Sequence, residues 1–141
     1  MNTIDLATEF CTRGKDCHGF GHYGASRGRR KHKGIDVVAN VGDKVMACST
    51  GRISKIGYPY SPQDPAKGFL RYVEVTTGKG YKERYFYCST TLKVGDPVLK
   101  HDHFATCQDL CCIYGGITPH LHFEVKKMGM FIDPIKYIEK L

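Results

Sequence analysis

Several features that mark particular protein classes are missing from this 141-residue chain. No run of about 18 apolar residues occurs, so the sequence predicts no membrane-spanning helix. The first six residues lack the basic stretch and the apolar stretch of a signal peptide. We therefore expect either a cytosolic protein or a chain whose leader has been removed.

The composition bounds the fold class. Apolar residues make up 41% of the chain and charged residues 25%, which excludes a disordered or collagen-like protein. The length predicts a single domain over residues 1–141, with residues 1–16 as an N-terminal extension. Tryptophan is absent, whereas 16 glycines and nine tyrosines indicate strands and turns rather than helices.

Positive charge is concentrated in one segment. Residues 13–33 contain seven lysines and arginines against one acidic residue, Asp16, so they hold most of the net charge of +7. Such a segment can attract an anionic glycan or an anionic surface, or it can be a solvated loop. Aromatic residues do not alternate with these charges, and no nucleic-acid-binding module is recognisable, so the pattern disfavours nucleic acid as the partner.

The seven cysteines leave the redox compartment open. No pair of CxxC motifs has the spacing of a zinc finger. An even subset could form disulfides in an oxidising compartment, or all could be reduced and buried as small apolar residues. The seven cysteines are Cys11, Cys17, Cys48, Cys88, Cys107, Cys111 and Cys112.

Short segments of alternating polarity predict strands, separated by turn residues. The expected strands cover residues 45–50, 52–57, 70–76, 84–88 and 120–126. Residues 78–80 predict a hairpin turn, and the three prolines within residues 58–65 predict an exposed loop. Near the C-terminus, Asp133 as N-cap and Pro134 in the first turn predict a short helix that runs toward Leu141.

A five-residue pattern occurs twice. Val41–Val45 and Val94–Val98 both place a Gly-Asp turn before an apolar position, as expected at equivalent corners of a sandwich or barrel. The sequence therefore predicts an all-β fold, mainly antiparallel and small, with a short C-terminal helix.

Two histidine patterns indicate a metal site. His32 and Asp36 lie four residues apart with Gly34 between them, and we expect the glycine to allow close approach to the group they hold. His120 and His122 alternate on an expected strand, so both imidazoles project from one face. One of these histidines, together with His32 and Asp36, would make a zinc site with two nitrogen ligands and one oxygen ligand.

Glu124 lies on the same strand face as the histidine pair. A carboxylate at that position can orient a ligand imidazole by accepting a hydrogen bond from its second nitrogen. Either histidine pattern alone is more often structural than metal-binding. Their occurrence together, with the glycine between His32 and Asp36, favours the metal site.

These motifs resemble those of the lysostaphin/LytM-type zinc metallopeptidases. The matching segments are residues 32–36, 42–47, 51–53 and 120–125, within a similarity that covers roughly residues 30–135. The resemblance implies an antiparallel β-fold with zinc held by His32, Asp36 and His122, and a catalytic role for His120. It also implies a substrate in the peptide part of bacterial cell walls.

One position departs from this family. Tyr87 stands where the active enzymes carry a second catalytic histidine. A phenol has a pKa near 10 against about 6.5 for an imidazole, so Tyr87 would be a poor base at neutral pH. It could still donate a hydrogen bond to an oxyanion. Loss of an acid–base group lowers a rate by about 10² to 10⁴.

The departure is similar to that of a chemotaxin-like subgroup of secreted animal signalling proteins. Further matching segments are residues 18–23, 27–32, 86–87 and 114–117. The cysteine pattern of that subgroup does not match, because Tyr81 occupies one position where it has a cysteine.

Two functions follow as hypotheses. The first is a zinc-stabilised, catalytically silent signalling or binding domain, secreted, whose basic surface meets an anionic glycan or a cell-surface receptor. The second is an active zinc endopeptidase of bacterial, phage or effector origin that cleaves peptidoglycan cross-links. There His120 would act, and Tyr87, His101 or His103 would compensate for the missing histidine.

Overall fold

A computed structural model describes residues 3–8, 10, 13, 21–27, 30–110 and 117–141 of the chain. Within these residues, most regular structure is strand, and the helix α1 (Pro134–Glu139) lies near the C-terminus. None of the helices in this part of the chain is long and apolar enough to cross a membrane.

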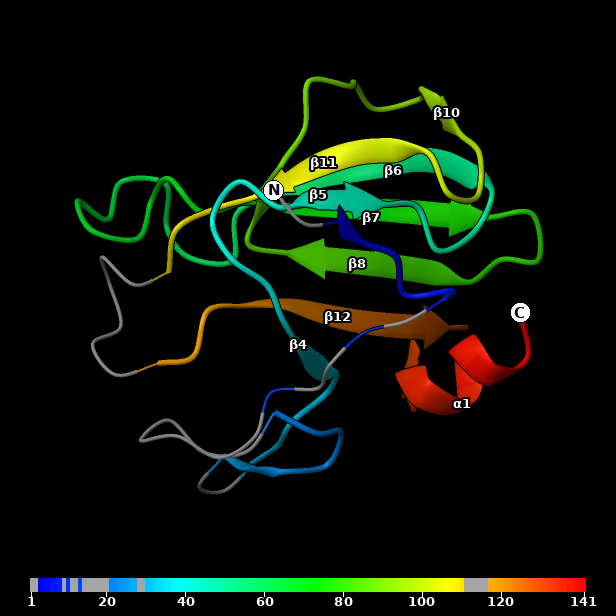
Figure 1. Ribbon diagram of the computed structural model, residues 1–141, viewed down its shortest axis with the longest axis horizontal. Coiled ribbons are helices and arrows are strands. Elements are labelled where there is room, and N and C mark those ends of the chain that lie inside the picture. Colours follow the sequence, from blue (N-terminus) through cyan, green and yellow to red (C-terminus); the bar gives the residue numbers. More distant parts are fainter. Residues whose placement is uncertain (1–2, 9, 11–12, 14–20, 28–29, 111–116) are drawn as a thin grey trace.

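The larger sheet has seven strands, and its pairs are antiparallel. Its strand order is β10 (Pro97–Val98), β6 (Gly51–Gly57), β7 (Tyr72–Thr77), β8 (Lys82–Phe86) and β12 (His120–Lys127), after which β4 (Ile35–Val38) and β13 (Met130–Ile132) both pair with β12. Figure 1 shows β8 and β12 side by side, with β4 along the far edge of β12.

A smaller sheet has the strand order β1 (Thr3–Ile4), β5 (Lys44–Met46), β11 (His103–Cys107) and β9 (Cys88–Ser89). Its β1–β5 pair is parallel and the other pairs are antiparallel. A third, two-stranded sheet consists of β2 (Ser26–Arg27) and β3 (Arg30–Lys31). The chain is thus mainly antiparallel β with one short C-terminal helix, as the sequence predicted.

Apolar side chains from both larger sheets form the core. On β12, Leu121, Phe123 and Val125 are fully buried, whereas the residues between them face the other side of the sheet. Tyr85 on β8 packs against Phe123, with ring centroids 5.0 Å apart. Because strand side chains alternate, the burial of these residues fixes the histidines of β12 on the opposite face.

The residues set apart as an N-terminal extension contribute to this core. Ile4 and Leu6 are buried among the core residues, and β1 pairs with β5. The described part of this segment is therefore integrated into the sheet structure.

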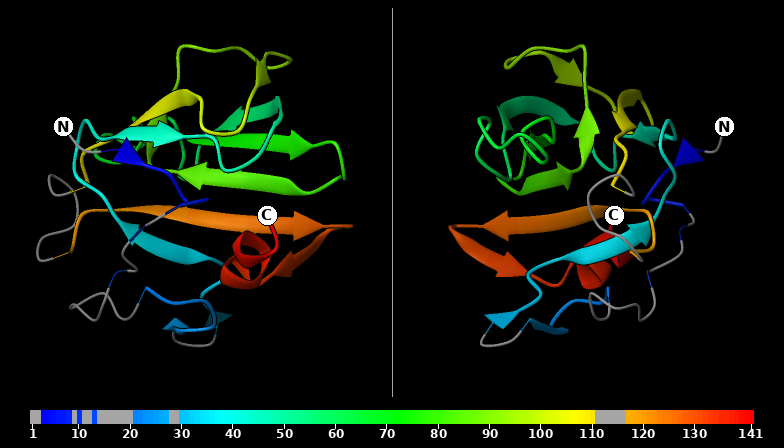
Figure 2. Two further views of the ribbon diagram at one scale, coloured as in Figure 1. Left: turned by 45° about the vertical axis from the view of Figure 1, so that its right-hand side comes forward. Right: turned by 90° about the vertical axis from the view of Figure 1, so that its left-hand side faces the viewer.

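The helix begins as the sequence predicted. The Asp133 side chain accepts a hydrogen bond from the Ile135 backbone N–H, and Pro134 occupies the first turn. Buried Tyr137 packs the helix against the core, and Figure 2 shows α1 beside β12 and β13.

The repeated Gly-Asp pattern forms equivalent turns. In Asn40–Asp43 the carboxylate of Asp43 accepts the N–H of Asn40 at 2.9 Å, and in Lys93–Asp96 the carboxylate of Asp96 accepts the N–H of Lys93 at 2.8 Å. A third turn, Leu99–Asp102, has the same bond at 2.9 Å without the glycine. The third residue of each turn has a positive φ: Gly42, Gly95 and His101.

Two predicted strands end earlier than expected. The strand predicted over residues 45–50 stops at Met46, because the backbone of Ala47 bonds to the Leu99–Asp102 turn instead of continuing the ladder. The strand predicted over residues 84–88 is interrupted at Tyr87, whose φ is 68°. The residues of the predicted 58–65 loop form no strand, but Pro59 and Tyr60 line the cavity described below.

The cysteines that the structure describes are free thiols. Cys48, Cys88 and Cys107 are buried, and burial raises the pKa of the Cys107 thiol to about 12. They behave as small apolar core residues at neutral pH. The other four cysteines lie outside the described residues.

Candidate metal centre

The pairing of β4 with β12 brings the two histidine motifs together. In this antiparallel register Asp36 is directly opposite His122. His32 lies just before β4, where its backbone N–H bonds to the carbonyl of Ala25 at 2.7 Å. His122 therefore meets His32 and Asp36, which precede it by more than 80 residues, on the outer face of the large sheet.

Gly34 allows this close packing. A Cβ atom at this position would collide with the carbonyl oxygen of Phe123 and would lie 3.0 Å from His122 Cε1. The sequence pattern predicted that Gly34 would approach the group held by His32 and Asp36. The close approach is instead to the backbone of β12, because the loop before β4 lies directly against that strand.

We expect Gly34→Ala to lower the free energy of unfolding by about 2–3 kcal/mol, since the added methyl group meets backbone that cannot move independently. Urea unfolding measures this change. Gly78→Ala is the matched control, because a Cβ there meets nothing within 4 Å. Equal stabilities of the two variants would contradict the close approach.

Three donor atoms lie close enough to bind one metal ion. His32 Nε2 is 3.0 Å from His122 Nδ1 and 3.2 Å from Asp36 Oδ1, and His122 Nδ1 is 2.8 Å from Asp36 Oδ1. In a tetrahedral zinc site with bonds of about 2.0–2.1 Å, ligand atoms are about 3.3 Å apart. The group of two imidazoles and one carboxylate therefore fits zinc after only small shifts.

The remaining ring nitrogens have acceptors that orient the imidazoles. His32 Nδ1 lies 2.9 Å from the carbonyl oxygen of His22, and His122 Nε2 lies 2.9 Å from Glu124 Oε1. Hydrogen bonds of this kind fix the ring orientation and leave the other nitrogen for a metal. Glu124 thus contacts the imidazole of His122, which is a candidate ligand.

Asp36 is the electrostatic centre of the cluster. Burial alone would raise the pKa of this carboxyl, but hydrogen bonds from His122 and His32 hold the pKa well below its usual range. Its Oδ2 accepts Nε and Nη2 of Arg13 at 3.1 and 2.8 Å, which leaves Oδ1 toward the histidines. Arg13 is itself buried, so it is not part of a solvated basic loop.

His122 carries the opposite charge in the metal-free cluster. Burial alone would lower its pKa, but hydrogen bonds to Asp36 and Glu124 raise the pKa to about 9. Binding of a metal at neutral pH therefore has to displace a proton from His122.

His120 lies beside this group without belonging to it. Its Nδ1 is 2.8 Å from the carbonyl oxygen of Thr118, and its Nε2 is 3.7 Å from Asp36 Oδ2. Burial lowers the pKa of His120, so the ring is neutral at neutral pH. A neutral imidazole whose Nδ1–H is held by a carbonyl presents Nε2 as a proton acceptor.

Tyr87 is next to His120 in the structure. The two rings meet edge to face, with centroids 5.6 Å apart and planes at 85°. A positive φ is uncommon for a bulky residue, and the conformation of Tyr87 is fixed by bonds from its N–H to Arg71 and from the N–H of Gln108 to its carbonyl. The strand break at this residue therefore directs the phenol toward the histidines.

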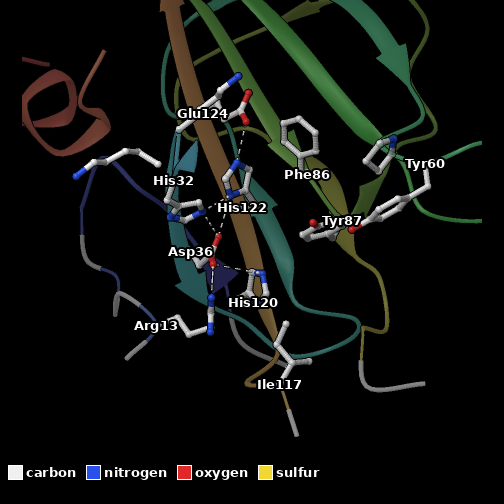
Figure 3. Close-up of a pocket in the computed structure, with 13 residues that line it drawn as sticks. Arg13, His32, Asp36, Tyr60, Phe86, Tyr87, Ile117, His120, His122 and Glu124 are labelled. Atoms are coloured by element: carbon white, nitrogen blue, oxygen red, sulfur yellow. Dashed lines mark hydrogen bonds and ion pairs between the residues drawn. The ribbon is translucent and has the colours of Figure 1, made fainter. Parts of the chain in front are cut away.

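All of these side chains line a cavity of about 390 Å³ (Figure 3). Pro59, Tyr60, Phe86 and Ile117 contribute apolar surface, and Lys31 and Lys33 lie at the wall formed by the segment around His32. Sequence reasoning did not identify Arg13, Tyr60, Phe86 or Ile117 as site residues. No local motif marks them, because their places depend on loops and strands that meet only in the folded chain.

Two histidines proposed as compensating groups lie elsewhere, which corrects that part of the peptidase hypothesis. His101 bonds to Asp5 near the N-terminus, and exposed His103 pairs with Met46 in the smaller sheet. Neither lines the cavity.

Known proteins are similar to this chain in sequence and in fold. Leukocyte cell-derived chemotaxin-2 from Bos taurus is 31% identical over 123 residues, which cover 87% of this chain and 76% of that protein. The catalytic domain of lysostaphin from Staphylococcus simulans has a TM-score of 0.64 at 24% identity, with 89% of this chain and 92% of that domain covered. Against the longer lysostaphin chain the TM-score is 0.67 at 20% identity, and only 53% of that chain is covered.

The likeness to lysostaphin shows a shared fold. The model of peptidase family M23 matches residues 30–134, a range that contains both histidine motifs and Tyr87. The chain belongs to peptidase family M23.

Proposed function

We propose that this domain binds zinc through His32, Asp36 and His122 and acts by binding a partner rather than by cleaving peptides. The proposal extends to this chain the signalling role implied by the name of the chemotaxin relative. Its partner would be a cell-surface receptor or an anionic glycan outside the cell. Zinc would add its binding free energy to the stability of the fold.

The position of Tyr87 is the observation that supports this proposal most. Its ring stands against His120 at the cavity wall, where a second base would have to act. A phenol with a pKa near 10 stays protonated at neutral pH, so it can donate a hydrogen bond but cannot accept a proton. Among the described residues that line the cavity, His120 is therefore the one imidazole outside the proposed ligand set.

A peptidase is the second candidate, because of the state of His120. Its neutral ring has an Nε2 beside the proposed metal position, as a general base requires. Zinc, when bound, supplies Lewis acidity toward a water or a carbonyl oxygen. In this alternative His120 takes up a proton and Tyr87 donates a hydrogen bond to developing negative charge, and the substrate is a peptidoglycan cross-link.

A turnover assay distinguishes the two candidates. We expect zinc-loaded protein to release no peptide ends from purified peptidoglycan, and Tyr87→His to gain turnover by about 10² to 10⁴ over that background, since it restores a base. His120→Ala in the Tyr87→His background should abolish the gain. Zinc-dependent turnover by the natural sequence that His120→Ala removes would contradict the silent-domain proposal and establish the peptidase.

A further inference from the structure

Three lysines gather just beyond the proposed metal position on the outer face of the large sheet. Lys126 on β12 is directly opposite Lys82 on β8. Lys33, from the segment before β4, lies over the ring of Phe131, with Nζ 4.9 Å from the ring centroid. Nζ of Lys126 lies 4.5 Å from the same centroid, so the ring of Phe131 contacts two ammonium groups.

The lysine cluster (Lys33, Lys82 and Lys126) forms no ion pair within the part of the chain that the structure describes. No described carboxylate lies within 4.0 Å of their ammonium nitrogens. Two acidic residues in the neighbouring row of the sheet have hydrogen-bond partners of their own: Glu74 bonds to Arg84 at 2.7 Å, and Glu124 bonds to His122 at 2.9 Å. Lys82 attracts Glu74 more weakly, without an ion pair.

Such an arrangement is unfavourable without a ligand. Like charges directly opposite one another on adjacent strands are destabilising. The cost is small for exposed side chains, but the same cluster would stabilise any anion that binds between the ammonium groups.

The lysine cluster is aligned with the cavity. Lys33 follows His32 directly and lines the cavity wall. Lys126 is four residues beyond His122 on the same strand face, which is about 13 Å between Cα atoms at the usual strand rise. An extended peptide that runs along β12 would reach the cluster with the fourth residue beyond the one at the metal position.

The wall across the cavity from the proposed ligand histidines has a different character. Pro59, Tyr60 and Tyr87 form that wall, and Figure 3 shows Tyr60 and Tyr87 across the cavity from the ligand histidines. Lys67 and Arg71 lie over tyrosine rings of the same loop but do not line the cavity. Among the described residues no cation lines this wall, so a polymer with negative charge along its whole length would meet cations only on the side of Lys31, Lys33 and Arg13, and Arg13 is already paired with Asp36. A ligand with one anionic end fits better.

We propose that the cavity binds an extended peptide whose carboxylate, three or four residues from the residue at the metal position, is held by Lys33, Lys82 and Lys126. The inference rests on the proposed function, because it takes the metal position as one end of the peptide path. It adds the substrate or partner class: an acidic peptide with its carboxylate on the β13 side of the cavity.

The test uses synthetic hexaglycine peptides, acetylated and amidated, with one glycine replaced by Glu or by Gln at each position in turn. Binding to zinc-loaded protein is measured by calorimetry, with metal content determined in the same sample. At the best position we expect the Glu peptide to bind about tenfold more tightly than the Gln peptide. The preference should weaken as salt rises from low to physiological ionic strength.

Lysine substitutions test whether the preference for Glu peptides arises from the lysine cluster. Lys33→Gln combined with Lys126→Gln should remove the difference between Glu and Gln peptides. Lys136→Gln combined with Lys140→Gln, at exposed positions of α1 and its C-cap, is the matched control and should retain it. A preference that survives the first pair of substitutions, or equal binding of Glu and Gln peptides to the natural protein, would overturn the proposal.

Two further outcomes separate this inference from the proposed function. A heparin hexasaccharide that binds more tightly than every Glu peptide, and loses affinity in Lys33→Gln with Lys126→Gln, would replace the peptide by a glycan. Protein that retains no zinc after loading would contradict the metal proposal. Such metal-free protein could still bind Glu peptides more tightly than Gln peptides. If the lysine substitutions removed that difference, the lysine cluster would still be supported as a carboxylate site.

Discussion

Removal of zinc by a chelator is expected to lower the melting temperature of this protein by about 10 °C. Zinc at a thousand times its dissociation constant stabilises a fold by about 4 kcal/mol. In a domain of about 150 residues, each kcal/mol shifts the melting temperature by about 2–4 °C. Removal also leaves buried Asp36 with only its protein partners. Differential scanning calorimetry with and without chelator measures the shift.

Single substitutions assign this effect to the three donor atoms. His32→Ala should bind no stoichiometric zinc and should melt at the same temperature with or without chelator. His103→Ala is the matched control, because it removes an exposed imidazole that does not line the cavity. A His32→Ala protein that keeps one zinc ion per chain would rule out the proposed ligand set.

Arg13→Ala is expected to lower the free energy of unfolding by about 3 kcal/mol in the metal-free protein, because it removes the cation that contacts Oδ2 of a buried carboxylate while protonated His122 still contacts Oδ1. Both the guanidinium and Asp36 are buried, and two nitrogens of Arg13 contact Asp36 Oδ2. This is a large share of the 5–15 kcal/mol that stabilises a typical domain. Arg13→Lys should recover only part of the loss, since an ammonium cannot reproduce the two-nitrogen contact.

Urea unfolding with and without zinc tests the cause of this loss. Zinc takes up the charge of Asp36, so the cost of Arg13→Ala should be smaller in zinc-loaded protein. Arg52→Ala removes an exposed arginine that bonds only to the carbonyl of Gly95 among the described contacts, and should change stability by less than about 1 kcal/mol. Similar losses for the two arginine variants would show that the contact with Asp36 does not stabilise the fold.

The parts of the structure that could be predicted are those with a local signal. Alternation along residues 120–127 placed His120 and His122 on one face, because a strand has a period of two. Asp133 and Pro134 predicted the start of α1 because an N-cap and a first-turn proline act within a few residues. The proposed ligand set needed the family resemblance, since spacing alone left open which histidine of β12 would join His32 and Asp36.

The parts that could not be predicted depend on long-range contacts. Nothing near Arg13 in the sequence indicates that it is buried against Asp36, 23 residues away. Tyr87 has a left-handed backbone conformation, which sequence patterns predict mainly for glycine and asparagine. Its conformation is fixed by backbone hydrogen bonds to Arg71 and Gln108. The early end of β5 depends on hydrogen bonds to a turn more than 50 residues further along the chain. The residues of the predicted strand do not indicate this contact.

The opposition of Asp36 and His122 also determines when the site can exist during folding. The two residues are 86 positions apart, so a nascent chain exposes His32 and Asp36 long before β12 is synthesised. Until β12 pairs with β4, only two of the three donors are available, and a metal ion would be held weakly. Once β12 is in place, an ion bridging the three side chains would close a loop of that length, and cross-links over long loops restrict the unfolded chain most. A metal at this position would therefore bind late in folding. It would stabilise the pairing of β12 with β4 after the sheet has formed rather than guide its formation.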